Sequence, residues 1–396
     1  MYSKINVSEK IFYLGVNDRR KQLFENIWPL PDGVSYNSYL IRDEKSALLD
    51  TVEMGTAGDF TGWINYILEG KPLDYLIINH MEPDHAGEIG HVVQAFPDVK
   101  IVGNSKTFPL LKAFFGIEDN LMEVKDGDTL DLGHHKLKFV MTPWVHWPET
   151  MMTYDTTEKM LFSGDAFGTF GTLDGCIFDD EIDFAKYEGE MLRYYSNIVG
   201  KYSNMVQKAF AKLSGVEVKT ICSVHGPVWR KDPARVLALY DKWSKQEPDG
   251  SVVIAYASMY GNNAALADYV ARKLAEQGVR NIKVHDVSKT HMSYIIRDVW
   301  KAKGVVLGTC SYNTQMFPLM KSLVDEFVLQ GIKNKKLAIF GTHSWNGCGV
   351  KDLAKFAEES GWELVAEPLD VHGSPTPDKV GECDALAVAM ADKLKE

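Results

Sequence analysis

Residues 76–85 constrain the fold of this chain more than any other stretch. They read Leu-Ile-Ile-Asn-His-Met-Glu-Pro-Asp-His, and the apolar start predicts a buried strand that ends in a turn, because Pro83 takes the chain out of regular structure. Side chains two positions apart on an extended backbone point to the same side, so we expect His80 and Glu82 to lie together. The turn lets Asp84 and His85 face the same space from another direction. The stretch therefore predicts a metal-binding loop with room for two cations.

A polar surface turn is the other explanation for these residues. It would suffice for a single histidine, but four ligand-type side chains within six positions, directly after a strand-like run, favour a metal site. The following residues, 86–96, carry apolar side chains at helical spacing, namely Ile89, Val92, Val93 and Phe96. A strand, a loop and a helix thus form one unit.

Length and composition place the chain among ordinary globular proteins. Its 396 residues predict two or three domains, and 45% apolar with 24% charged residues supplies enough material for sizeable cores. No apolar run is long enough to span a bilayer, and the first ten residues lack the apolar segment of a signal peptide. We therefore expect a cytoplasmic protein without a membrane partner.

The cysteines and the net charge argue against several other classes. The five cysteines are scattered without a Cys-x-x-Cys pair, which disfavours a disulfide framework, a thiolate zinc site and a four-cysteine iron module. A net charge of −11 without long runs of one sign disfavours nucleic acid as a partner.

The first half of the chain has short β-like runs separated by turn residues, with two helical segments between them. Ser105 is the expected N-cap of the second helix. The expected strands span residues 11–16, 38–41, 46–50, 99–103 and 138–141, and the expected helices span 59–69 and 105–115.

Three further candidate ligands follow β-like runs in this half. His146 follows residues 139–145, Asp165 follows 160–164, and His225 follows 220–224. A lone histidine after a strand is more often a core or rim residue, but repetition around one fold favours a shared site. Together with the loop, this makes four histidines and three carboxylates, a set that suits two metals and favours iron or manganese over structural zinc. His134 and His135 lack this context, and we interpret them as turn residues.

The pattern His80-x-Glu82-x-Asp84-His85, followed by His146, Asp165 and His225, resembles the N-terminal module of the flavodiiron proteins, or A-type flavoproteins. That family is a branch of the metallo-β-lactamase-like fold, so the resemblance implies an αββα sandwich. Zinc hydrolases of the fold usually carry histidine at the position of Glu82, and a carboxylate oxygen there suits iron. The resemblance further implies that His80, Glu82 and His146 bind one iron, that Asp84, His85 and His225 bind the other, and that Asp165 bridges them.

A polar segment, residues 244–250, separates this half from a second one and has the composition of a linker. Strands and helices then alternate strictly, which predicts a doubly wound parallel sheet whose ligand lies at the carboxyl ends of its strands. The domains are thus expected at residues 1–249 and 250–396. The expected strands span 252–256, 282–284, 304–308, 336–341 and 363–366, and the expected helices span 264–276, 294–301, 318–329, 350–359 and 378–395.

Three turns at strand ends of this second half are candidate cofactor loops. The first offers a hydroxyl, a glycine and two amides before a helix, so backbone N–H groups can hold a phosphate; neither dinucleotide nor nucleotide-triphosphate fingerprints occur. Aromatic residues in the other two could flank a flat ring, or Tyr312 and Trp345 could merely cover the sheet edge. The candidates are Ser258, Met259, Tyr260, Gly261, Asn262 and Asn263; Thr309, Cys310, Ser311, Tyr312 and Asn313; and Thr342, His343, Ser344, Trp345, Asn346 and Gly347.

This half resembles flavodoxin, whose first turn holds the FMN phosphate and whose two later loops hold the isoalloxazine ring. The first turn departs from the flavodoxin signature Thr-x-Thr-Gly-x-Thr, but its position after a diiron-like module makes the combination specific. FMN and two irons store four electrons, which matches reduction of O2 to water, and two of them suffice to couple two NO to N2O. The resemblance implies one or both reactions. Trp144, Trp147 and Phe167 lie beside the ligands in sequence, and we interpret them as walls rather than catalysts.

The resemblance also implies partners. Electrons must come from outside, because neither a rubredoxin-like module nor an NAD fingerprint is present, and the family uses a separate rubredoxin or a reduced deazaflavin as donor. It assembles as a head-to-tail homodimer, or a dimer of such dimers. Two rival functions are a metallo-hydrolase with a fused flavodoxin domain, which would hold zinc, and a simple electron carrier, which would leave seven ligands unexplained.

Overall fold

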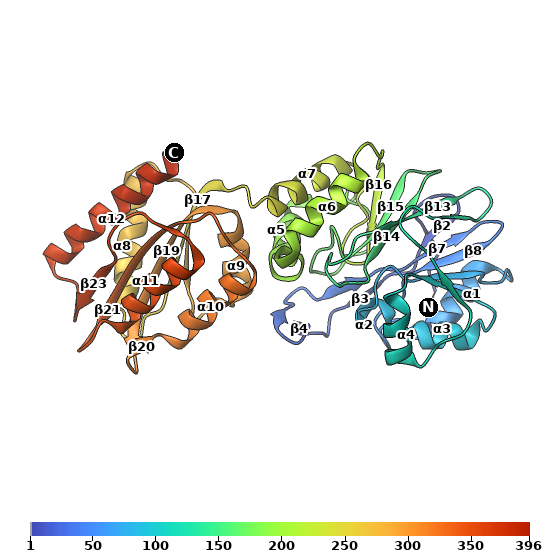
Figure 1. The fold of residues 1–396 in the computed structure, drawn as a ribbon, viewed down its shortest axis with the longest axis horizontal. Coiled ribbons are helices and arrows are strands. Elements are labelled where there is room, and N and C mark those ends of the chain that lie inside the picture. The colour runs from blue at the N-terminus through green and yellow to red at the C-terminus, as the bar shows by residue number, and fades with distance from the viewer. Residues whose placement is uncertain (1) are drawn as a thin grey trace. The chain divides into compact units, whose positions relative to one another are not determined.

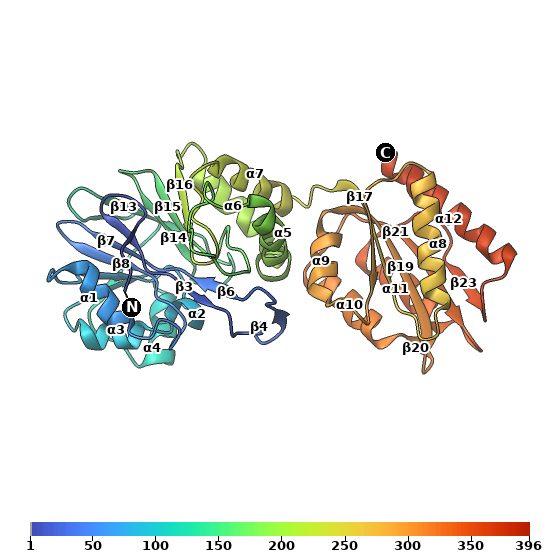
Figure 2. The same cartoon turned by 180° about the vertical axis from the view of Figure 1, so that it is seen from behind.

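The computed structural model describes residues 2–396, and its contacts divide the chain into two compact units, Met1–Ser244 and Lys245–Glu396. The N-terminal unit contains two sheets with helices on their outer sides, α1, α3 and α4 on one and α5, α6 and α7 on the other (Figures 1 and 2). This is the expected αββα sandwich, which is therefore confirmed.

The first sheet of this unit has seven strands, and the second has five. The first runs, in spatial order, β1 (Ile5–Asn6), β2 (Ile11–Tyr13), β7 (Tyr39–Arg42), β8 (Ser46–Leu49), β9 (Tyr75–Ile77), β10 (Lys100–Gly103) and β11 (Leu121–Glu123). The second runs β12 (Thr129–Asp131), β13 (Lys136–Met141), β14 (Met151–Asp155), β15 (Met160–Gly164) and β16 (Thr220–Ser223). Two small ribbons pair β3 (Val16–Asp18) with β6 (Val34–Tyr36) and β4 (Leu23–Phe24) with β5 (Trp28–Pro29).

Strand direction places the functional side chains. Strand β14 is antiparallel to both β13 and β15, and β15 is parallel to β16, so β13, β15 and β16 end at the same edge of the second sheet. In the first sheet, β8 to β11 are parallel, and β9 is fully buried because its side chains are apolar on both faces. His80 follows the carboxyl end of β9.

The helices of the N-terminal unit correct two expectations. Pro83 does not end regular structure but begins the short helix α2, where the missing proline N–H costs nothing. Ser105 is not a cap: Asn104 turns the chain first by accepting from the Lys106 amide at 3.0 Å, and α4 starts at Thr107. The helices are α1 (Phe60–Leu68), α2 (Pro83–Ala86), α3 (Ile89–Ala95), α4 (Thr107–Phe115), α5 (Phe184–Tyr194), α6 (Ser203–Leu213) and α7 (Pro233–Ser244), with a π-helical turn at Tyr195–Val199 and a 3-10 turn at Gly200–Tyr202.

The C-terminal unit is the expected doubly wound sheet. Its main strands are parallel, in the order β18 (Ile282–Asp286), β17 (Asp249–Tyr256), β19 (Ala302–Tyr312), β21 (Lys336–His343) and β22 (Glu363–Leu364). The fifth strand is broken: Pro368, which has no N–H, separates β22 from β23 (Leu369–His372), and β23 pairs with the end of β21. The short β20 (Gln315–Met316) folds back antiparallel on β19.

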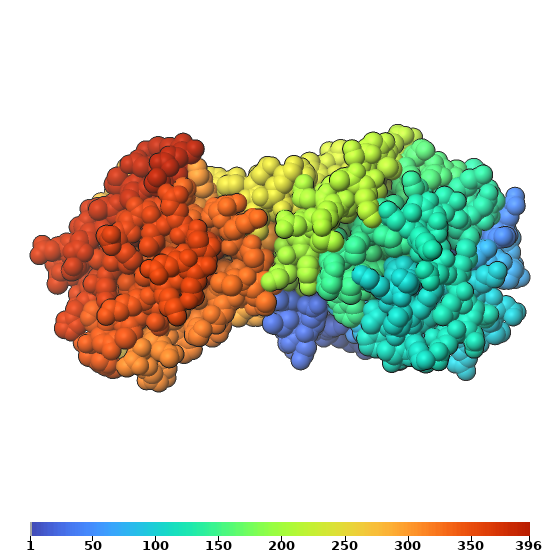
Figure 3. Space-filling view, viewed as in Figure 1, coloured from blue at the N-terminus to red at the C-terminus, as the bar shows by residue number. Residues whose placement is uncertain are grey.

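Helices cover both faces of this sheet. Helices α8 (Asn262–Glu276) and α12 (Pro377–Lys395) contact each other on one face and share a buried apolar core with the strands. The other face carries α9 (Met292–Lys301), α10 (Pro318–Leu329) and α11 (Cys348–Ser360). In the space-filling view the atoms of this unit are mostly orange and red (Figure 3).

Candidate functional site

Seven side chains at strand ends of the N-terminal unit form one buried cluster. Their residues are at most 7% exposed to solvent. Four of them lie in the loop after β9 of the first sheet and in the following helix α2. The other three follow β13, β15 and β16 of the second sheet. The cluster comprises His80, Glu82, Asp84, His85, His146, Asp165 and His225, which are all seven side chains that the sequence singled out.

The first group within the cluster is His80, Glu82, His146 and Asp165. The His80 Nε2 atom lies 3.3 Å from Glu82 Oε2 and 3.2 Å from Asp165 Oδ2. The His146 Nε2 atom lies 3.0 Å from the same Glu82 oxygen and 3.5 Å from the same Asp165 oxygen. Two imidazoles and two carboxylates therefore converge on a single small space.

The second group is Asp84, His85 and His225. Both imidazole Nε2 atoms lie 3.3 Å from Asp84 Oδ2. The other oxygen of Asp165, Oδ1, lies 3.1 Å from His85 Nε2 and 3.5 Å from His225 Nε2. Because its Oδ2 faces the first group and its Oδ1 faces the second, Asp165 joins the two.

Several polar atoms in the cluster are buried without a hydrogen-bond partner among residues 2–396. They include both carboxylate oxygens of Asp84, Oδ2 of Asp165 and Nε2 of His225. Burying such groups unpaired is costly, and metal ions would compensate them. The donor set of imidazoles and carboxylates without thiolate suits iron or manganese. The residues therefore fit a pair of metal ions.

Charges within the cluster shift its pKa values in opposite directions. Burial would raise the pKa of Asp165, but the positive charges of His85 and His80 hold it well below its usual range. Burial would lower the pKa of His85, but the charges of Asp84 and Asp165 raise it to about 9. The Asp165 carboxylate thus draws positive charge to the histidines, and bound cations would take the place of these protons.

Three groups that the sequence analysis missed hold the cluster in place. Glu149 Oε1 accepts from the Nδ1 atom of His80 at 2.7 Å and from the Met81 amide at 3.0 Å. The Nδ1 atom of His225 donates to the Ser35 carbonyl at 2.8 Å. The Tyr194 hydroxyl donates to Asp165 Oδ1 at 2.8 Å. No local sequence signal marks these partners, because each contact is made only in the folded chain.

Of the three expected wall residues, one contacts the ligands. The Trp147 ring packs edge-on against His80 at 5.2 Å between centroids. The Trp144 ring is 40% exposed and stacks on Tyr202 instead, and Phe167 packs against Tyr240. Trp147 is thus the aromatic wall beside the first group.

The three candidate cofactor loops of the C-terminal unit meet at the carboxyl ends of β17, β19 and β21. They line two hollows that share Met259, Tyr260, Ser311 and Ser344. Gly261 has a φ of 94° and precedes α8, so the amides at the start of this helix can face an anion. The other lining residues are Ser258, Asn262, Cys310, Tyr312, Asn313, Thr314, Thr342, His343, Trp345, Asn346 and Gly373.

Four of the candidate residues do not line either hollow. Asn263 is buried and donates to the Ala257 carbonyl at 2.8 Å, which closes the first turn. Thr309 is buried and accepts from the Phe317 amide at 3.3 Å. Gly261 and Gly347 each precede a helix, and a Cβ on Gly347 would meet Asp370. Thr314 and Gly373, which the sequence analysis did not include, do line the hollows.

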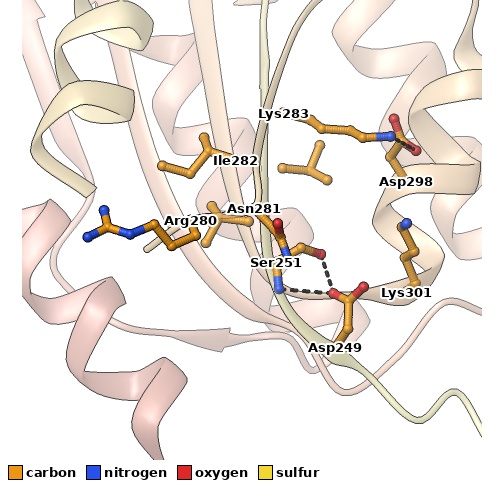
Figure 4. A pocket seen from close by; sticks show the side chains of 10 residues that line it. Asp249, Ser251, Arg280, Asn281, Ile282, Lys283, Asp298 and Lys301 are labelled. Carbon is orange, nitrogen blue, oxygen red and sulfur yellow. Dashed lines mark hydrogen bonds and ion pairs between the residues drawn. The ribbon is translucent and has the colours of Figure 1, made fainter. Parts of the chain in front are cut away.

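A further hollow of about 330 Å³ opens at the amino ends of β17 and β18, the opposite edge of this sheet (Figure 4). Lys283 pairs with Asp298 at 2.7 Å, and the Ser251 amide donates to Asp249 at 2.9 Å. Since these charges have partners within the fold and lie away from the candidate loops, we assign no ligand to this hollow.

Comparison with known proteins adds independent information. The ODP family beta lactamase model matches residues 34–226, and the flavodoxin model matches residues 254–393. The chain is 34% identical over 366 residues to the anaerobic nitric oxide reductase flavorubredoxin of Escherichia coli (strain K12 / DH10B), covering 91% of this chain and 76% of that protein.

Solved structures resemble both units together. The rubredoxin oxygen:oxidoreductase of Desulfovibrio gigas matches with a TM-score of 0.94 and 29% identity over 99% of each chain. The flavodiiron protein of Giardia intestinalis matches with a TM-score of 0.95 and 25% identity over 100% of this chain and 97% of that one. Among the helices of residues 2–396, none combines the length and apolar character needed to cross a membrane.

Proposed function

This chain belongs to the flavodiiron family of oxidoreductases, and we propose that it scavenges O2, NO or both, with electrons relayed through FMN. Reduction of O2 to two waters takes four electrons and four protons. Coupling of two NO to N2O and one water takes two of each. An FMN and a diiron pair together store the larger number.

The observation that carries this proposal is the position of Asp165 between two groups of ligands. Its two oxygens face different histidine pairs, and each group adds a further carboxylate, Glu82 or Asp84. Such an arrangement supports two adjacent ions rather than one. We assign His80, Glu82 and His146 to the first iron, Asp84, His85 and His225 to the second, and Asp165 to both.

The protein's own residues have three tasks in this proposal. When bound, the two irons supply electrons and adjacent binding positions for a diatomic gas. The Glu149 carboxylate and the Ser35 carbonyl hold the Nδ1 atoms of His80 and His225, which leaves their Nε2 atoms for metal. The Tyr194 hydroxyl holds Asp165, and Trp147 limits the space beside His80.

For the flavin, we propose that the loop before α8 holds the FMN phosphate through backbone N–H groups. The exposed Tyr312 and Trp345 would flank the isoalloxazine ring. The remaining candidate residues of the three loops would contact the ring or shape the turns. The flavin supplies two electrons when reduced.

The test is anaerobic stopped-flow spectroscopy of the reduced holoprotein, mixed with O2 and separately with NO, after iron and FMN per chain have been measured. Two irons and one flavin with faster flavin reoxidation by O2 would identify an oxygen reductase. Faster reaction with NO and release of N2O would identify a nitric oxide reductase. Zinc in place of iron, with no reaction with either gas, would favour the hydrolase. Full electron-carrier activity without iron would favour the carrier.

The donor and the assembly are further parts of the proposal. We propose that a rubredoxin or a reduced deazaflavin delivers the electrons, and that the chain forms a head-to-tail homodimer or a dimer of such dimers. A variant that cannot bind iron, mixed and reassembled with a variant that cannot bind FMN, would then regain activity. Full activity of a monomer at high dilution would contradict the assembly.

A further inference from the structure

A second group of histidines lies at the other end of β13 from the diiron ligands. His134 and His135 directly precede this strand, whereas His146 follows its far end. A strand of six residues is about 20 Å long, so the two places are separate. Glu158, from the turn between β14 and β15, joins the pair, and one ligand atom from each residue lies within 4.8 Å of the others. The histidines do lie in a turn, as expected, but His135 is fully buried there.

The hydrogen bonds of the His135 ring resemble those of a metal-binding histidine. Its Nδ1 atom donates to Asp155 Oδ2 at 2.7 Å, and its backbone amide donates to Asp43 Oδ2 at 2.7 Å. Its Nε2 atom has no hydrogen-bond partner among residues 2–396 and faces Glu158 Oε1 at 3.8 Å. A carboxylate on one ring nitrogen fixes the tautomer and leaves the other nitrogen free to bind metal.

The other two members give the site an opening. His134 is exposed and packs edge-on against His135 at 5.1 Å between ring centroids. The side chain of Glu158 is 25% exposed. An ion would therefore approach the buried Nε2 atom from the side of His134 and Glu158.

The local charge favours a cation. Three carboxylates, those of Asp43, Asp155 and Glu158, surround His135, and Lys10 pairs with Asp43 at 2.6 Å. Burial would lower the pKa of His135, but the hydrogen bond to Asp155 and these negative charges raise it. The same negative charges would attract a metal ion, which would displace the proton from this ring.

We propose that His134, His135 and Glu158 bind one divalent transition-metal ion, with zinc as the best fit, at a site separate from the diiron centre. Two imidazoles and one carboxylate are a donor set that zinc accepts, and three protein ligands leave a position for water. The ion would tie the turn between β12 and β13 to the turn between β14 and β15. Its role is thus to stabilise this edge of the second sheet.

The experiment uses the holoprotein, loaded with iron and FMN, treated with a small excess of zinc chloride and then desalted. We expect one zinc per chain with the iron content unchanged. Zinc-edge X-ray absorption should show nitrogen and oxygen ligands at about 2.0–2.1 Å and outer-shell scattering from imidazole. Iron does not interfere at this edge.

Two variants and two controls decide whether these residues are the ligands. His134→Ala and Glu158→Gln alter exposed or half-buried side chains and should leave the fold and the iron intact. Each should weaken zinc binding by at least the roughly tenfold that loss of an outer-shell partner costs. His91→Ala and Glu217→Gln remove a histidine and a carboxylate elsewhere on the surface and should bind zinc as the wild type does.

Three results would overturn the proposal. The first is that the wild-type holoprotein retains no zinc. The second is that His134→Ala and Glu158→Gln retain zinc as well as the controls do. The third is that zinc uptake is matched by loss of iron, which would place the zinc at the diiron ligands. In each case the carboxylates around His135 would only hold its ring in place.

Discussion

The two cofactor regions of this molecule are built in opposite ways. The candidate diiron ligands are buried, and outer partners such as Glu149 and Tyr194 hold them in place. The candidate flavin loops are open to solvent, with Tyr260 91% and Trp345 80% exposed. The difference indicates that a cluster of charged ligands needs a buried and shaped pocket, whereas a large flat cofactor can rest on loops at the edge of a rigid sheet.

The physical reason lies in the cost of burial. Each ionised carboxylate in the cluster loses its water shell, so every oxygen must find a cation or a hydrogen bond. Backbone N–H groups at a helix start are already aligned and need no buried charge to hold a phosphate. Changes to the metal region should therefore have larger effects than changes to the flavin region.

The largest expected effect comes from Asp165→Ala. If Asp165 serves both irons, its loss removes the shared ligand from both groups of histidines. We expect loss of both irons and a fall in gas reduction of more than about 100-fold, the upper end of what an outer-shell substitution costs. Iron and flavin analysis should show FMN retained. Retention of two irons would contradict a shared role, and Asp119→Ala, an exposed carboxylate, is the matched control.

The second-largest effect is expected from Glu149, which holds the His80 ring in place. Glu149→Gln keeps the shape of the side chain but weakens its hold on the His80 ring and the Met81 amide. We expect iron affinity to fall by about 10- to 100-fold while the fold persists. Competition with a chelator measures this affinity. The exposed Glu9→Gln should bind iron normally, and equal iron retention in both variants would mean that Glu149 does not position His80.

A smaller effect is expected in the flavin region. Trp345→Ala removes one ring that would flank the isoalloxazine, and stacking of this kind contributes about 0.5–1.5 kcal/mol. FMN binding, followed by fluorescence quenching, should weaken by about three- to tenfold with the iron content unchanged. Trp345→Phe should restore most of the affinity. Unaltered binding by the alanine variant would mean that this ring only covers the sheet edge.

The smallest effect concerns a buried charge in the flavodoxin-like unit. Lys335 is 1% exposed, and its Nζ atom donates to the Trp300 and Ala302 carbonyls at 2.9 and 2.7 Å. Burial lowers its pKa to about 7, and Asp249 opposes this only in part. The unfolded chain therefore binds this proton more tightly, so the folded state is destabilised below pH 7 and recovers as pH rises toward 10.

Lys335→Met should remove this pH dependence. At pH 6 we expect the variant to unfold at a higher temperature than the wild type. This difference in unfolding temperature should shrink by roughly 5 °C by pH 10. Thermal unfolding followed by circular dichroism at several pH values measures this. A difference that stays constant with pH would show that Lys335 keeps its ordinary pKa.

The local chemistry of the chain was readable from its residues. Alternating strands and helices predicted the doubly wound sheet of the second unit, and the four ligand-type side chains after residue 79 predicted a metal loop, because strand periodicity and ligand chemistry depend on neighbours in sequence. Local expectations failed at three places: Pro83 starts a helix, Ser105 caps none, and a further strand, β23, follows Pro368.

Contacts between distant segments could not be read in this way. Asp165 faces both groups only because the carboxyl ends of β13, β15 and β16 share an edge. The Ser35 carbonyl reaches His225 across 190 positions of sequence, and the burial that leaves the His135 Nε2 atom unpaired needs strands from two hairpins. Residue types determine which ligands are available. Packing and strand register determine which atoms meet, because packing and register depend on the free energy of the whole fold.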